Sequence, residues 1–351
     1  MKSDWKTFLA AAGAEFDAER IAHYGNPEQE REVALSGLVF ADLEYQGVIA
    51  VHGDDAATFL QSQLSNDIRT LEPGRSQLSA FCTPKGRMLG LMRIFRSDDG
   101  YYLRLPADTL EAVLQRLRMY VLRANVSLED ATDNFLRIGV SGTDAASELG
   151  AIAGACPDTV NGVVQSGALT IIRVPGPGPR YEVYATALQA ARALWDALNV
   201  RGAPVGETAW RLLEIRAGLP AVFAPNSEEF VPQMANLQLV DGVSFKKGCY
   251  PGQEIVARMQ YLGTLKRRMY LGRIAQDTPA PPGALLYSAT DATQPVGRIV
   301  DAQPHPDAGL LALAVLQIHA AEADAVFLGS SDGPAFAIQP LPYPFPPDQS
   351  D

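Results

Sequence analysis

The sequence has few cysteines and no closely spaced cysteine pair. Its 351 residues include three cysteines, Cys82, Cys156 and Cys249, and four scattered histidines. The odd number and wide spacing of the cysteines argue against a disulfide framework and indicate a reducing compartment. Because no CxxC pair and no Cys/His cluster is present, the chain offers no self-contained zinc or iron-sulfur site. Any metal cluster chemistry would therefore need a ligand from outside the chain or from a partner.

Long apolar runs are also missing. Charged residues or glycine interrupt every hydrophobic stretch well short of the about 20 residues that a membrane-spanning helix needs. The N-terminal segment carries Asp4, Glu15 and Asp17 and lacks the uninterrupted apolar region of a signal peptide. We therefore expect a cytoplasmic protein with no membrane partner. With 47% hydrophobic and 20% charged residues, the composition is that of an ordinary globular protein, and the length predicts two or three domains.

Positive charge is scarce except in one segment. The 29 lysines and arginines stand against 40 acidic residues, a net charge of −11, which argues against coating of nucleic acid along the whole surface. Between Ser244 and Arg273 the balance reverses, with seven basic residues and one acid, Glu254. A basic island in an acidic protein suggests an anionic ligand. The basic residues of this island are Lys246, Lys247, Arg258, Lys266, Arg267, Arg268 and Arg273.

The island is organised around Cys249. Its pattern predicts a strand over Val243–Phe245, a tight turn, a short helix that ends at Gly263, and another strand. The turn places Cys249 near the positive end of the helix, with Lys246 and Lys247 just before it, and both influences favour the thiolate. The alternative interpretation is structural, with a small buried cysteine beside charges that only decorate the surface.

The same segment carries a family resemblance. Lys247-Gly248-Cys249-Tyr250, followed by Gly252-Gln253-Glu254, resembles the signature of the YgfZ family of folate-binding proteins, which are relatives of the glycine cleavage T-protein. The flanking residues are similar as well, over about forty residues without a gap. These flanks are Phe230-Val231-Pro232-Gln233 and Asn236-Leu237 before the motif, and Val256-Ala257-Arg258, Tyr261-Leu262-Gly263 and Lys266-Arg267 after it.

The resemblance implies an α+β fold of T-protein type, a multi-domain arrangement of two α+β units plus a C-terminal β-barrel around a central folate-sized hole. The patterning of the chain agrees with this expectation. Mixed strand and helix patterns occur twice before residue 200, and six short strands with Pro/Gly connectors follow Leu265. We expect the first unit at residues 1–130, the second at 131–205, a return segment with the cysteine motif at 206–263, the barrel at 264–345 and a tail at 346–351.

The resemblance also implies tetrahydrofolate as the cofactor and a set of residues that hold it. Around Cys82–Met88 the chain is similar to the folate domain of the T-protein, and Lys85 and Arg87 are expected to hold the glutamate tail of folate. A hairpin turn with surface charges is an equally good interpretation of these two residues. The other expected folate-binding residues are Gln233, Asn236, Tyr250, Gln253, Glu254 and Arg258.

The YgfZ family is associated with folate-dependent support of iron-sulfur enzymes and, through them, with tRNA modification. By resemblance, we expect this protein to support the assembly or repair of such enzymes, with iron-sulfur enzymes or assembly proteins as partners. Cys249 would act as a thiolate that touches iron, a persulfide or a one-carbon unit, and Lys247 would lower its pKa. Glu254 and Arg258 would position the segment. Turnover of a substrate stays open, and if it occurs the expected reaction is folate-dependent one-carbon transfer.

Three alternatives remain. The first is a folate-dependent aminomethyl or methyl transferase of the T-protein class. Two departures argue against it, because Leu89 and Gly90 stand where the T-protein has an aspartate pair, and Arg216 stands where it has a folate-binding glutamate. The second is a tRNA-binding module with a weak tRNA contact, and the third is a folate-binding scaffold without thiol chemistry. The tRNA contact would use Lys246, Lys247, Lys266, Arg267 and Arg268.

A run of alternating prolines and glycines, Pro175–Pro179, is a further candidate for a binding loop. Proline removes the amide donors that a phosphate-binding loop needs, and a strand pattern follows where a helix should begin. We therefore interpret this run as a rigid turn between two strands.

Overall fold

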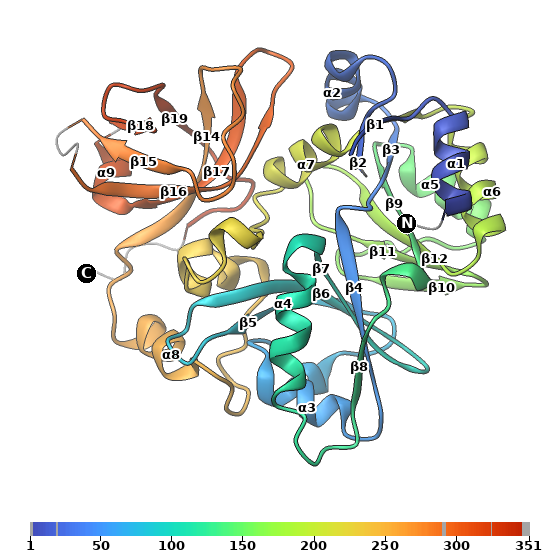
Figure 1. The fold of residues 1–351 in the computed structure, drawn as a ribbon, viewed down its shortest axis with the longest axis horizontal. Coiled ribbons are helices and arrows are strands. Elements are labelled where there is room, and N and C mark those ends of the chain that lie inside the picture. The colour runs from blue at the N-terminus through green and yellow to red at the C-terminus, as the bar shows by residue number, and fades with distance from the viewer. Residues whose placement is uncertain (1–2, 19, 290–292, 324, 346–351) are drawn as a thin grey trace.

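The computed structural model describes residues 3–18, 20–289, 293–323 and 325–345. Two sheets with their helices occupy one side of the molecule, and a curled C-terminal sheet lies beside them (Figure 1). Helix α7 (Glu207–Arg216) runs between these parts and contacts both the second sheet and the C-terminal sheet. The centre of the molecule is therefore surrounded by elements from distant parts of the chain.

The first sheet is antiparallel and has the strand order β5-β6-β7-β4-β8. Two helices cover one face of it, α3 (Ala56–Gln63) and α4 (Ala107–Arg118), whose apolar side chains pack with those of the strands. In α4, Leu110, Val113 and Leu117 recur at helical spacing and are all buried. The strands are β4 (Gln46–His52), β5 (Ser76–Cys82), β6 (Met88–Ser97), β7 (Gly100–Pro106) and β8 (Ser127–Asp130).

The second sheet has the strand order β10-β11-β12-β9-β3-β13, in which β13 runs parallel to β3. Helices α1 (Ser3–Ala11), α5 (Ala145–Ala153) and α6 (Leu188–Leu198) bury Trp5, Leu149 and Trp195 in a core shared with this sheet. Trp210 of α7 lies against Gly139, where an added Cβ would meet the indole at 2.5 Å. The strands are β3 (Val39–Asp42), β9 (Leu136–Ser141), β10 (Val163–Ser166), β11 (Leu169–Arg173), β12 (Arg180–Ala185) and β13 (Ala203–Pro204).

The two sheets repeat one layout, as the repeated pattern of the sequence predicts. The chain order β4-α3-β5-β6-β7-α4 corresponds to β9-α5-β10-β11-β12-α6, and the sheet order β5-β6-β7-β4 corresponds to β10-β11-β12-β9. The strands that lead into each unit are exchanged, since β3 pairs with β9 and β8 pairs with β4. The chain up to Asp42, which lies within the predicted 1–130 unit, therefore contributes its strand β3 to the other sheet.

The six strands predicted after Leu265 are confirmed and form one antiparallel half-barrel sheet, in the order β18-β15-β16-β17-β14-β19. A bridge between Phe327 and Ala335 joins its two edges. Short helix α9 (Ile318–Glu322) follows β17. The strands are β14 (Arg267–Ile274), β15 (Leu285–Ser288), β16 (Pro295–Pro304), β17 (Leu310–Gln317), β18 (Val326–Leu328) and β19 (Phe336–Gln339).

The segment between α7 and α8 (Gln253–Tyr261) differs from its predicted structure, because no strand forms over Val243–Phe245. The chain advances instead through single 3-10 turns. Asn236 and Asp241 adopt left-handed backbone conformations, with φ of 56° and 55°, and each turns the chain before an extended run can build. These turns are η3 (Ala224–Asn226), η4 (Pro232–Ala235) and η5 (Leu237–Val240).

Helix α8 forms where it was predicted, but its end differs from the prediction. Its C-terminal capping residue is Leu262, and Gly263 does not adopt the left-handed conformation.

The C-terminal segment is attached to the end of α7. The Tyr343 hydroxyl donates to the carbonyl oxygen of Gly218 at 2.7 Å, and the predicted tail at 346–351 lies outside the described residues. Over the described part of the chain, every helix is too short or too polar to cross a bilayer.

The N-terminal region also holds secondary structure that its polar sequence conceals. A hairpin, β1 (Glu15–Asp17) with β2 (Arg20–His23), precedes helix α2 (Pro27–Ser36). The side chain of Asn26 accepts a hydrogen bond from the Gln29 amide, and Pro27 occupies the first turn, which is a favourable helix start.

Candidate functional site

The cysteine motif is seated on the turn between β5 and β6. Gly252, with φ of 83°, approaches so closely that an added Cβ would lie 2.4 Å from the Thr83 carbonyl oxygen and 2.6 Å from the Gly86 Cα. On the other side, a Cβ on Gly86 would meet Ile255 of α8 at 3.0 Å. Glycine is required at such contacts because any side chain would push the two segments apart. The fold thus brings together the two stretches in which the sequence resembles folate-binding proteins.

Lys247 anchors this motif to the C-terminal end of α3. Its ammonium donates to the carbonyl oxygens of Gln61 at 2.6 Å and Asn66 at 3.1 Å, and also to that of Leu64. The side chain is 7% exposed, and burial lowers its pKa to about 8. The carbonyls at a helix end lack partners within the helix, so the lysine satisfies acceptors that burial would otherwise leave unpaired. The same Nζ lies 5.1 Å from the centre of the Tyr250 ring.

Cys249 is the accessible thiol of the chain. Of the three cysteines, it is exposed, Cys156 is half-buried and Cys82 is buried. Burial raises the pKa of Cys82 to about 12, so that this thiol stays protonated and unreactive at neutral pH. Beside Cys249, Gly248 has no atom within 4 Å of an added Cβ, so the turn is uncrowded at this point. Within the described residues, no three His, Cys, Asp or Glu side chains gather as metal ligands.

Three of the predicted folate-binding residues hold the motif in place through hydrogen bonds to backbone carbonyls. Gln233 is buried and its Nε2 donates to the Val256 carbonyl of α8 at 2.6 Å. Asn236 is buried as well, and its Nδ2 donates to the Met269 carbonyl of β14 at 2.8 Å. The Gln253 Nε2 donates to the carbonyl of Lys247 itself at 3.4 Å. These bonds connect the motif with the half-barrel sheet and keep it in place.

The other predicted folate-binding residues with charged side chains lie on the surface around the motif. Lys85, Glu254 and Arg258 are exposed. Arg87 is exposed too, and its Nη1 donates to the carbonyl oxygens of Glu228 at 3.1 Å and Glu229 at 2.7 Å. The ammonium of Lys85, the guanidinium of Arg258 and the remaining donors of Arg87 face solvent, where an anion could reach them.

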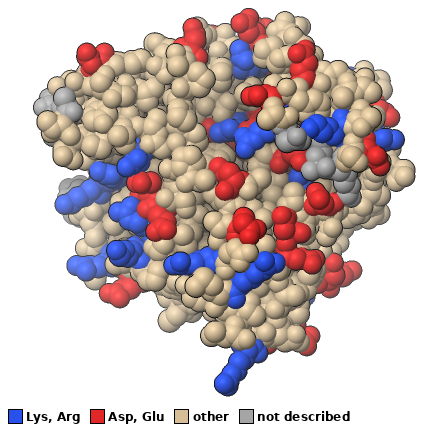
Figure 2. Space-filling view, viewed as in Figure 1, with Lys and Arg blue, Asp and Glu red and all other residues tan. Residues whose placement is uncertain are grey.

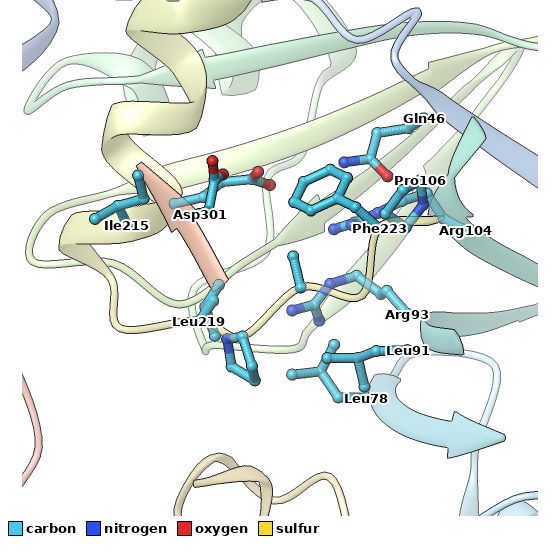
Figure 3. A pocket seen from close by; sticks show the side chains of 13 residues that line it. Gln46, Leu78, Leu91, Arg93, Arg104, Pro106, Ile215, Leu219, Phe223 and Asp301 are labelled. Atoms are coloured by element: carbon cyan, nitrogen blue, oxygen red, sulfur yellow. The ribbon is translucent and has the colours of Figure 1, made fainter. Parts of the chain in front are cut away.

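A polar cavity lies farther along the same hairpin, in the centre of the molecule. It has a volume of about 30 Å³ and is lined by Arg93 of β6, Arg104 of β7, Gln46 of β4, Glu214 of α7 and Asp301 of β16, together with apolar residues (Figure 3). A space of this size holds about two water molecules. None of the residues that the sequence singled out as folate ligands lines it.

The cavity wall contains buried arginines, and some of their N–H donors have no acceptor. Arg104 pairs with Glu182, whose pKa burial alone would raise but the arginines bring below its ordinary value. Arg93 is 1% exposed, its Nη1 donates to the Asn161 side chain at 2.7 Å, and its Nε and Nη2 have no partner. Buried donors without acceptors are costly, so they indicate a place for a ligand or ordered water.

An acidic group and an amide face the same cavity. Glu214 accepts a hydrogen bond from the Tyr45 hydroxyl at 2.8 Å, and burial raises the pKa of this carboxyl. The Oε1 atom of Gln46 has no hydrogen-bond partner. The cavity therefore presents unpaired donors, an unpaired acceptor and a carboxyl within one space, and ordered water or a ligand with both donors and acceptors could pair with them.

These cavity residues were missed by reasoning from the sequence. The signal that could have found them is a charged residue inside an apolar strand, as for Arg93 between Met92 and Ile94 and Arg104 between Leu103 and Leu105. The same signal marks Glu182, the ion-pair partner of Arg104, between Tyr181 and Val183. Such residues are rarely buried unless they are paired or functional. Arg93 and Arg104 are also cross-strand partners in the register of β6 and β7.

Comparisons with known proteins agree with this architecture. The chain matches the family model described as the GCVT N-terminal domain over residues 10–247. It is 31% identical over 318 residues to the tRNA-modifying protein YgfZ of Klebsiella pneumoniae (strain 342), covering 90% of this chain and 96% of the relative. The protein of the same name from Enterobacter sp. (strain 638) is also 31% identical over 318 residues, covering 90% of this chain and 97% of the relative.

A solved structure extends the comparison to the whole fold. The glycine cleavage system aminomethyltransferase T from Bartonella henselae superposes with a TM-score of 0.78 over 96% of each chain, at 19% sequence identity. The predicted T-protein-like fold, with mixed α+β sheets and a half-barrel sheet near the C-terminus, is confirmed. On the identity and coverage of its relatives and on the matching domain, the chain belongs to the YgfZ family.

Proposed function

We propose that this protein binds tetrahydrofolate in its central cavity and supports the assembly or repair of iron-sulfur enzymes, and through them tRNA modification, with Cys249 as a functional thiol. The observation that carries the proposal is the position of Cys249 on an exposed turn whose neighbouring residues are held in place. Cys249 is exposed on an open turn, and yet the residues around it are fastened by the Lys247 ammonium and by the contact between Gly252 and the β5–β6 turn. An exposed thiol on a rigid support suits transfer or ligation chemistry with a partner protein.

The folate part of the proposal rests on the family and on the unpaired groups of the cavity. The pterin ring of folate carries amide-like donors and acceptors, which would match the free Oε1 of Gln46 and the free donors of Arg93. Ligand pockets usually measure about 300–1,000 Å³, whereas this cavity measures about 30 Å³. Binding of the whole cofactor would therefore require the wall to open, and the segment Leu219–Phe223 lines it without regular secondary structure.

Substitution of Gln46 tests the folate site. Gln46→Met removes the unpaired acceptor and keeps the size of the side chain, so tetrahydrofolate affinity measured by calorimetry should fall about tenfold. Cys249→Ala should bind tetrahydrofolate as tightly as the wild type, because its side chain lies on the exposed turn. Equal affinity of Gln46→Met and wild type would remove the cavity as the binding site.

The thiol is tested in cells that lack this protein, through the activity of an iron-sulfur dehydratase. Wild type and Cys156→Ala should restore the activity, while Cys249→Ala should not, since Cys156 is the matched control thiol that is half-buried and remote in sequence. Rescue by Cys249→Ala would reduce the role of the protein to a folate-binding scaffold. Failure of the wild type itself to rescue would direct attention to transferase or tRNA chemistry.

Two residues of β6, Leu89 and Gly90, argue against the transferase alternative. A Cβ on Gly90, one of the two positions where the T-protein has aspartates, would lie 2.8 Å from Val113 Cγ2 of α4. A carboxylate at this position would have no room, and Leu89 supplies no charge. Transfer of a labelled aminomethyl or methyl group by the purified protein would restore this alternative.

A tRNA contact is the second candidate, favoured by the surface near α8. Figure 2 shows basic side chains gathered along the left edge of this face, over α8 and the start of β14. Lys246, Lys266 and Arg258 are exposed, whereas Lys247, which the sequence assigned to this contact, is buried and engaged with carbonyl oxygens. Affinity for labelled tRNA should fall steeply with salt, and Lys266→Gln should lower the salt slope by about one unit. No measurable binding at physiological salt would remove this candidate.

A further inference from the structure

A second hollow of about 460 Å³ lies between the half-barrel sheet, the end of α7 and the Pro175–Pro179 turn. It shares no lining residue with the central cavity. We call it the β14 groove, because Leu271 and Arg273 of β14 form its floor together with their register partners Gln339 and Leu311. Its volume falls in the range of about 300–1,000 Å³ that is typical of small-molecule sites.

The β14 groove gathers three cationic or proton-donating side chains. Arg216 ends α7, and its side chain makes no hydrogen bond or ion pair within the described part of the chain. Arg273 is fixed by its Nη2, which donates to the carbonyl oxygens of Asp307 at 3.3 Å and Ala308 at 2.5 Å, so that its other nitrogens remain available. Two guanidinium groups in one groove repel each other unless an anion lies between them.

His305 supplies the third donor. The Asp307 backbone amide donates to its Nδ1 at 3.2 Å, so the neutral ring carries its proton on Nε2. Burial, with Arg273 and Arg216 nearby and only Asp307 opposing them, lowers the pKa of His305. The carboxylate of Asp307 is 83% exposed, and water screens it from the arginines. It is the one acidic residue among those that line the groove.

We propose that the β14 groove binds a small organic phosphate, with the phosphate group held between Arg216 and Arg273 and hydrogen-bonded by Nε2 of His305. A phosphate monoester presents three oxygens, one for each donor, whereas a carboxylate presents two. Leu271 and Leu311 of the floor, with Pro177, Pro340 and Pro342, supply apolar surface beside these donors, and this surface suits a flat organic group such as a nucleobase. Pro177 comes from the turn that lacks phosphate-binding amides, so the oxyanion is recognised by side chains alone.

Binding of adenosine 5′-monophosphate to the full-length protein, measured by calorimetry, tests this proposal, with adenosine, inorganic phosphate and the dinucleotide ApA as comparisons. The monophosphate should bind, adenosine should bind at least tenfold more weakly, and Arg216→Gln should weaken monophosphate binding about tenfold. The matched control is Arg123→Gln, an exposed arginine outside the groove, which should bind like the wild type. In the wild type, NMR should show the pKa of His305 rising when the monophosphate is present, because a bound anion favours the imidazolium.

Several outcomes would overturn the proposal. Equal affinity for adenosine and its monophosphate would leave only an apolar hollow, and equal binding by Arg216→Gln and Arg123→Gln would place the anion elsewhere. Binding of ApA without the monophosphate would point to a nucleic acid chain in place of a small ligand. His305 signals that do not respond to the monophosphate would exclude this groove even if binding occurs.

Discussion

Replacement of Lys247 with methionine decides whether this residue holds the cysteine motif or tunes the thiol. Methionine keeps most of the apolar stem and removes the ammonium that bonds the carbonyls of Gln61, Leu64 and Asn66. A hydrogen bond to a charged group contributes about 1.5–3 kcal/mol, and two of the three acceptors lie in fully buried bonds. Burial disfavours the ammonium and offsets part of this gain, as its lowered pKa shows. We expect Lys247→Met to lower the free energy of unfolding by about 2–3 kcal/mol.

The assay is urea denaturation of Lys247→Met beside Lys246→Met. Lys246 is the exposed neighbour with the same chemistry, so its substitution should change the free energy of unfolding by less than about 0.5 kcal/mol. Hydrogen exchange should also quicken over residues 248–250 in Lys247→Met, because the loop loses its attachment to α3.

A thiol measurement separates the two roles of Lys247. The rate at which iodoacetamide labels Cys249, followed by mass spectrometry across pH, reports the fraction of thiolate. If Lys247→Met were as stable as Lys246→Met while its Cys249 labelled much more slowly at neutral pH, the lysine would act on the thiol directly. The anchoring argument would then be refuted.

Two further predictions concern a backbone contact and a buried acid. Gly252→Ala should lower the free energy of unfolding by about 2 kcal/mol or more, because Gly252 has a left-handed φ and a Cβ there would collide with the Thr83 carbonyl oxygen. Gly248→Ala in the same motif is the control and should change the free energy of unfolding by less than about 0.5 kcal/mol. Equal denaturation curves for the two variants would contradict this prediction. Burial raises the pKa of Asp42 to about 6 although the Trp5 indole donates to it at 2.7 Å. The folded state therefore holds an extra proton between about pH 4 and 6, and across this window the wild type should lose up to about 3 kcal/mol relative to Asp42→Asn as pH rises; parallel pH profiles would show that the carboxyl is not perturbed.

Much of the fold could be predicted because it depends on local patterns. The six strands of the half-barrel sheet were predicted from short apolar runs between prolines and glycines, and α8 was predicted from the local pattern as a short helix before Gly263. The predicted strand over Val243–Phe245 does not form, since two alternating apolar residues cannot outweigh the left-handed turns at Asn236 and Asp241 just before them. Helix α2 was missed because its polar sequence hides a favourable start at Asn26-Pro27.

The candidate site could be predicted only in part. Cys249 was identified from its motif, and the structure places it on an exposed turn. Gln233 and Asn236 were expected to contact folate, and this stays a prediction. Their amide nitrogens make buried bonds to the carbonyls of Val256 and Met269, while their amide oxygens have no partner among the described residues. A side chain's type and sequence neighbours do not reveal which way it points, because that depends on the element that packs against it.

The sequence by itself determined the family, the repeated α+β pattern, the half-barrel strands and the thiol, since each is written in residues that are close together in the chain. Only the tertiary structure decided that Lys247 points into the end of α3 and that Arg93, Arg104 and Glu214 share one buried space. These side chains come from strands and helices far apart in sequence, and burial together with charged partners changes their chemistry. The free energy of a buried charge depends on partners that the chain supplies only when it is folded.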